Sequence, residues 1–81
     1  MRRAAKRDEN EAYIRLALER HGAKTWPISG EGLPDLLVLF RGRYYAMEVK
    51  GKHGKRTPAQ EASQHPVVRT PAEALRIIGA A

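Results

Sequence analysis

The chain has 81 residues, and its 15 Lys and Arg residues outnumber its 9 Asp and Glu residues, which gives a net charge of +6. A chain of this length buries only about 60 to 65% of its unfolded surface, so we predict one domain over residues 1–81 with a thin margin of stability. Cysteine is absent, which excludes disulfides and thiolate zinc sites. A metal held by oxygen ligands, or self-association, could then supply the additional stability that a domain of this size needs.

The pattern of charge and hydropathy indicates where the protein is located and what kind of partner it binds. No apolar run reaches the ~20 residues of a membrane span, and no hydrophobic stretch follows the basic first residues. We therefore expect a cytoplasmic protein without a membrane contact, in which residues 1–7 form a flexible basic tail. Excess positive charge favours a polyanion as partner. A second basic cluster follows the central apolar segments and is expected to contact phosphates; it comprises Lys52, His53, Lys55 and Arg56.

The first predicted element is a helix over residues 8–21. Ile14 and Leu18 recur at helical spacing, and Gly22 is a natural stop. Glu11 lies three residues before Ile14 and seven before Leu18, which puts its carboxylate on or beside the face that packs inward.

A β-hairpin is predicted next, with strands over residues 36–40 and 43–50 joined by the two-residue connection Arg41-Gly42. Because side chains alternate along a strand, Glu48 and Lys50 share one face, about 6.5 to 7 Å apart. Before the hairpin, “KTWPIS” predicts a short edge strand, since a proline cannot donate to a ladder.

The C-terminal half contains two predicted helix starts, each with a capping Thr, a Pro at the first helical position and a Gln or Glu at the third. Thr57 begins one and Thr70 the other, and “PVVR” between them predicts a short buried strand. The order of elements indicates an α/β fold with a small mixed β-sheet flanked by helices. If the valine strand is parallel to residues 43–50, the crossover is right-handed.

Charged side chains interrupt the apolar hairpin at one end. Asp35 heads the first strand, and Glu48 and Lys50 lie at the matching end of its antiparallel partner. Mg²⁺ takes one or two carboxylates, accepts phosphate oxygens and lowers the pKa of a bound water, which a nearby lysine could hold. The alternative is that Asp35 caps a turn while Glu48 and Lys50 form a solvated pair on an exposed face. Spacing alone leaves both hypotheses open.

The run “GLPD”, then twelve residues, then “EVK” resembles the PD-(D/E)xK nuclease superfamily. The small size, the early helix and “KRTPAQ” soon after the lysine resemble its VRR-NUC (virus-type replication-repair nuclease) group. The resemblance covers residues 11–79. It implies a restriction-endonuclease-like core with a catalytic hairpin, Mg²⁺ or Mn²⁺ as cofactor, and structured or branched DNA as substrate.

The resemblance also assigns roles to individual residues. Asp35, Glu48 and the backbone carbonyl of Val49 would be the metal ligands, and Lys50 the catalytic lysine. The first-helix acid that contacts the ion, the glutamine near the phosphate, and a loop serine of the related archaeal Holliday junction resolvases correspond to Glu11, Gln60 and Ser29. One departure is the segment “AQEASQHP”, which leaves room for about two helical turns where the family usually has about three.

The expectation is therefore a metal-dependent DNA endonuclease, with four-way junctions as the sharpest substrate. A homodimer is expected because stability is thin and one site hydrolyses one phosphodiester at a time. The rivals are a non-catalytic nucleic-acid-binding module on the same fold and a small regulatory or toxin-like partner protein. Trp26 is expected in the core or an interface rather than as a base-stacking platform, and Tyr44 in sheet packing rather than in the site.

Overall fold

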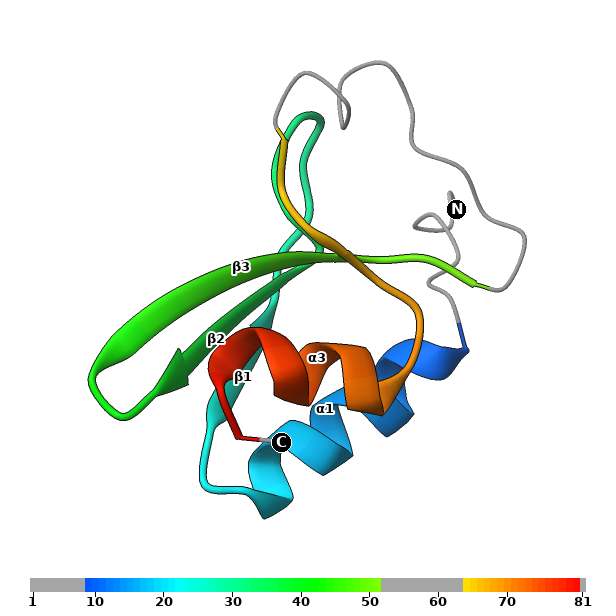
Figure 1. Ribbon diagram of the computed structural model, residues 1–81. Helices are drawn as coiled ribbons and strands as arrows, with labels where there is room; N and C mark the ends of the chain where they lie inside the picture. Colours follow the sequence, from blue (N-terminus) through cyan, green and yellow to red (C-terminus); the bar gives the residue numbers. More distant parts are fainter. Residues whose placement is uncertain (1–8, 52–63, 81) are drawn as a thin grey trace.

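The computed structural model describes residues 9–51 and 64–80, and within them it forms an α/β fold (Figure 1). Four strands make one mixed sheet in the order β1-β2-β3-β4, which confirms the predicted fold class. The predicted helix start at Thr57 lies outside the described residues. The elements are α1 (Asn10–Arg20), β1 (Lys24–Pro27), β2 (Leu36–Phe40), β3 (Arg43–Val49), β4 (Val67–Val68) and α3 (Pro71–Ile78).

The hairpin of β2 and β3 is the centre of the sheet. Its strands pair antiparallel from Phe40↔Arg43 to Leu36↔Met47. Arg41 and Gly42 form the two-residue connection with φ angles of 52° and 80°, and two consecutive positive φ angles are those of a type I′ turn. This turn twists in the same sense as the strands, so the predicted hairpin is confirmed.

The outer strands complete the sheet as the sequence predicted. β1 pairs antiparallel with β2 and forms an edge, where Pro27 costs no ladder bond. β4 pairs in parallel with the end of β3, with Glu48 opposite Val67 and Val49 opposite Val68. A parallel partner at this point leaves the C-terminal end of β3 between two strands.

Local sequence explains the two helices. In α1, Ile14 and Leu18 are fully buried at the expected spacing, and the chain turns away after Arg20. α3 begins at the predicted cap, where the Thr70 hydroxyl accepts a hydrogen bond from the Glu73 backbone N–H at 3.2 Å. The reciprocal bond differs from a standard capping box, because the Glu73 carboxylate accepts from the Arg69 N–H, one residue earlier, at 2.6 Å.

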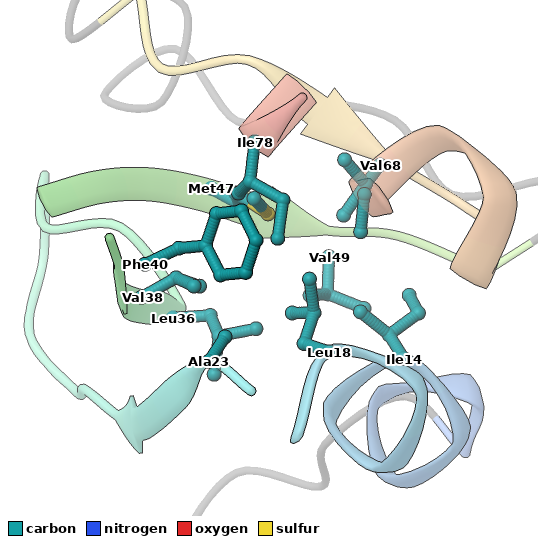
Figure 2. Close-up of a cluster of buried hydrophobic side chains, with 11 residues drawn as sticks. Ile14, Leu18, Ala23, Leu36, Val38, Phe40, Met47, Val49, Val68 and Ile78 are labelled. Carbon is teal, nitrogen blue, oxygen red and sulfur yellow. The ribbon is translucent and has the colours of Figure 1, made fainter. Parts of the chain in front are cut away.

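The apolar core lies between the two helices and one face of the sheet (Figure 2). Alternate residues of β2 and β3 point into it, as period-two packing requires. No helix in the described ranges is both long and apolar enough to span a bilayer. The core residues are Ile14, Leu18, Ala23, Leu36, Val38, Phe40, Met47, Val49, Val68, Ala74 and Ile78.

Candidate functional site

The candidate site lies at the open end of the hairpin, opposite the Arg41-Gly42 turn. The last regular pair of β2 and β3 is Leu36↔Met47, so the next position along each strand is Asp35 and Glu48. The two carboxylates predicted as metal ligands are therefore brought to the same end of the sheet.

The backbone of Asp35 is fixed from both sides. Its N–H donates to the carbonyl of Met47 at 3.0 Å, and its own carbonyl accepts from the N–H of Ile28 at 2.9 Å. These two bonds tie the residue to β3 on one side and to the end of β1 on the other. Asp35 is thus held in place although it precedes the strand.

The Asp35 carboxylate bonds to the β3 backbone just before the first residue of β2. Its Oδ2 atom accepts a hydrogen bond from the Val49 N–H at 2.9 Å, in the place where a paired strand would offer a backbone carbonyl. The bond seats the carboxylate beside the residue whose carbonyl was predicted as a third metal ligand. A carboxylate has about four acceptor positions, so one such bond leaves capacity for a cation.

Glu48 is a buried carboxylate within the sheet. Its side chain has 0% exposure, and its backbone N–H donates to the Pro66 carbonyl at 2.8 Å. The hypothesis of a solvated Glu48–Lys50 pair on an exposed face is therefore wrong. Burial of an ionised carboxylate costs several kcal/mol unless it is compensated by hydrogen bonds, an opposite charge or a metal.

Lys50 follows β3 and is held by two other segments. Its N–H donates to the Val68 carbonyl at 3.1 Å, and its carbonyl accepts from the Asn10 side-chain amide at 2.9 Å. The same Asn10 nitrogen donates to the Arg69 carbonyl at 2.8 Å. The Lys50 side chain is half-buried. One amide from the start of α1 thus joins the ends of β3 and β4.

Sequence reasoning missed Asn10, whose partners lie 40 and 59 residues further along the chain. The available signal was its place in the first turn of a helix, one residue before a predicted site residue. That neighbour, Glu11, is 6% exposed, which agrees with its predicted inward position. Because Asn10 bonds to Lys50, the start of α1 lies at the same end of the sheet as the candidate site.

The other predicted residues fall near the site or outside the described ranges. Ser29 is exposed and follows Ile28, the residue that pairs with Asp35. Within residues 9–51 and 64–80, no three side chains of His, Cys, Asp or Glu form a group that could hold a metal. The expected ligands are two carboxylates and one backbone carbonyl, so this result bears on Glu11 alone, whose direct contact with the ion would add a third carboxylate. Lys52, His53, Lys55, Arg56 and Gln60 lie outside the described residues.

Comparison with known proteins gives one informative match. No protein-family model matches the chain, and no curated protein matches it. A solved structure described as a VRR_NUC domain superimposes with a TM-score of 0.63 and 27% sequence identity. The match covers 84% of this chain and 88% of that chain. The similarity therefore extends over most of the fold and is not limited to one motif.

Proposed function

This chain has the fold of a VRR-NUC domain, a nuclease-family domain, and from that premise we propose that it is a metal-dependent DNA endonuclease. The observation that supports the proposal best is the bond from the Val49 N–H to the Asp35 carboxylate beside the buried Glu48. A binding module gains nothing from carboxylates aimed at phosphates, because without a cation they repel them.

The donor set suits a hard divalent cation. The carboxylates of Asp35 and Glu48 and the carbonyl of Val49 would hold Mg²⁺ or Mn²⁺, which prefer oxygen ligands and retain waters and phosphate oxygens in the remaining positions. When bound, the ion supplies charge stabilisation at the attacked phosphate and acidifies a bound water. A carboxylate already hydrogen-bonded to the protein is oriented before the ion arrives.

The chain's own residues would then direct the hydrolysis. The Lys50 ammonium would position the attacking water or take part in its deprotonation, and Glu11 would contact the ion through water. Gln60 would lie near the phosphate. Water oxygen bonds to phosphorus, the phosphorus–oxygen ester bond breaks, and the products are a phosphate monoester and a free hydroxyl.

The substrate is proposed to be structured or branched DNA, with four-way junctions first. The net charge of +6 attracts a polyanion, and Ser29, Lys52, His53, Lys55 and Arg56 are the proposed backbone contacts. A homodimer is proposed because a junction must be cut in two strands and each site cuts one. Size-exclusion chromatography with light scattering, followed by cleavage of a junction, a flap and a duplex, tests this part.

Asp35→Asn tests the activity itself. The amide oxygen can still accept from the Val49 N–H, so we expect the fold to persist while the ligand charge is lost. Substitution of residues that only support the metal ligands typically lowers metal affinity or activity by about 10- to 100-fold. Asp35 is itself a proposed ligand, so cleavage in Mn²⁺ should fall by more than about 100-fold. Calorimetric titration with Mn²⁺ should show weakened binding.

Glu31→Gln is the matched control, since it makes the same acid-to-amide change at an exposed loop residue four positions away. It should cut like the parent. An Asp35→Asn protein that cuts as fast as the parent contradicts the proposed site. Tight DNA binding with neither Mn²⁺ affinity nor cleavage in the parent would instead identify the non-catalytic module.

A further inference from the structure

The face of the sheet that points away from the described helices carries an aromatic pair. Both helices pack on the side formed by Leu36, Val38 and Met47, so the alternate residues lie on the opposite side. That side, called here the outer face, comprises Trp26, Leu37, Leu39, Tyr44 and Ala46. Trp26 is 42% exposed and Tyr44 is 64% exposed, so of the two places expected for Trp26, the core or an interface, the core is wrong.

The two aromatic rings form one continuous patch. Their centroids are 6.5 Å apart and their planes are inclined by 36°. Trp26 belongs to β1 and Tyr44 to β3, with β2 between them, so the rings lean toward each other across the middle strand. This arrangement presents aromatic surface to solvent, which a core residue would not do.

The charge around the patch is positive. This charge comes from Lys24, which is exposed on the outer face in the same row as Leu39 and Tyr44. Glu48 is the single carboxylate on strands β1, β2 and β3, and it is fully buried. An aromatic surface bordered by the Lys24 ammonium, on a chain with a net charge of +6, suits a polyanion that also has flat apolar groups.

We propose that the outer face binds unpaired bases of single-stranded DNA next to the cleaved phosphate. The inference rests on the proposed nuclease function for the position of that phosphate, but the binding itself does not require cleavage. Aromatic rings stack on any unpaired base, and cations contact the backbone that joins successive bases. A duplex hides its base faces, so it cannot use the rings in this way.

The spacing along β3 fits this assignment. Tyr44, Ala46 and Glu48 lie on one face at intervals of two residues, so Tyr44 is about 13 Å from Glu48 along the strand. A stacked DNA strand advances about 3.4 Å per base, so about four bases would separate the phosphate at the site from a base on the rings. A flap, in which paired and unpaired DNA meet, would then use the site and the rings together, whereas a fully paired four-way junction would use the site alone.

Trp26 is the single tryptophan of the chain, so its fluorescence reports directly on this face. The full-length protein is titrated in EDTA with a dT oligonucleotide and with a hairpin duplex of equal phosphate content. We expect the single strand to quench the emission and the duplex to leave it nearly unchanged. Binding of both DNAs with equal quenching, or with none, overturns the proposal.

Tyr44→Ala measures the contribution of stacking. Stacking on one aromatic side chain is worth about 1 to 3 kcal/mol per base, so affinity for the single strand should fall roughly 5- to 150-fold. Affinity for the duplex should change less than about twofold. Tyr13→Ala removes a tyrosine that is 67% exposed on α1 and should leave both affinities unchanged. If Tyr44→Ala is unstable, Trp26→Leu repeats the affinity comparison. Because that change removes the only fluorescent tryptophan, the comparison is then read from the fluorescence anisotropy of labelled DNA.

Three further outcomes separate this proposal from others. If Tyr44→Ala dissociates a dimer in sedimentation velocity and leaves single-strand affinity intact, the face binds a second copy and the proposal is wrong. If the parent cuts DNA in Mn²⁺ without any quenching, the nuclease function stands and the outer-face proposal fails. Quenching by single strands without cleavage of any DNA supports the outer-face proposal and contradicts the nuclease function.

Discussion

The two ends of the β2–β3 hairpin are held in different ways. At the turn end, Arg41 and Gly42 close the strands through their own backbone angles, and Arg43 and Tyr44 are exposed. At the open end, Met47, Glu48 and Val49 are buried in succession, on both faces of the strand. The turn end is thus a local structure, whereas the open end depends on packing.

The bonds at the open end come from distant parts of the chain. Asp35, Asn10 and Arg69 all bond to backbone groups of residues 49–51, with the Arg69 guanidinium donating to the Gly51 carbonyl. These contacts span 14, 40 and 18 residues. The candidate site is therefore assembled by tertiary contacts. Substitutions at the open end of the hairpin should affect stability and cleavage together.

The largest expected effect on stability is Leu36→Ala, at the open end. Leu36 is fully buried, and truncation of such a side chain costs about 2 to 5 kcal/mol. That is a large part of the roughly 4 to 12 kcal/mol expected for a chain of 81 residues. Urea denaturation followed by circular dichroism measures the loss.

The matched control is Leu39→Ala, the same substitution on the same strand near the turn, where the side chain is half-buried on the outer face. Its cost should be about 1 kcal/mol. Equal losses for the two leucines would mean that the outer face is packed as tightly as the inner face. The distinction between the ends and faces of the hairpin would then have no energetic basis.

The same comparison explains what the sequence could predict. Arg41-Gly42 and the Thr70 cap were foreseen because their signals lie within four residues, and the buried Glu11 because helical spacing fixes its face. The closeness of Asp35 to Glu48 also followed from the hairpin register alone.

The failures of prediction concern contacts between distant segments. Period-two alternation assigns Glu48 to one face, but it does not say whether that face is covered, and the structure buries it fully. Trp26 was expected in the core or in an interface because it sits beside Pro27 on a predicted strand, and the structure contradicts the core alternative, since Trp26 lies exposed on the outer face. The Asn10 bonds could not be inferred from spacing, because they depend on where the ends of β3 and β4 meet.

Asn10→Ala has an intermediate expected effect and tests whether the open end is held from α1. The change leaves the Lys50 and Arg69 carbonyls without their amide donor, which should cost about 1 to 3 kcal/mol. Because Lys50 is the proposed catalytic lysine, cleavage by the folded variant should also fall. Single-turnover cleavage in Mn²⁺, measured well below the melting temperature, separates this loss from unfolding.

Thr70→Ala is the stability-matched control for Asn10→Ala. It removes the cap of α3, a change worth about 0.5 to 2 kcal/mol, without removing a bond to the hairpin. Its cleavage rate while folded should equal the parent's. If the two variants cut equally well, Asn10 stabilises the fold and does not position Lys50.

Gly42→Ala should have the smallest effect on cleavage, because its effect should be confined to stability. Gly42 has a φ of 80°, and a Cβ placed there meets no atom within 4 Å, so the change measures backbone strain alone, at about 1 to 2 kcal/mol. Gly42→Asn should cost less, because Asn tolerates this conformation.

The turn is roughly 20 Å from Val49 along the seven residues of β3, so both variants should cleave DNA at the parent's rate while folded. Slower cleavage by either folded variant would show that strain at the turn reaches the site, and the two ends of the hairpin would then not be independent.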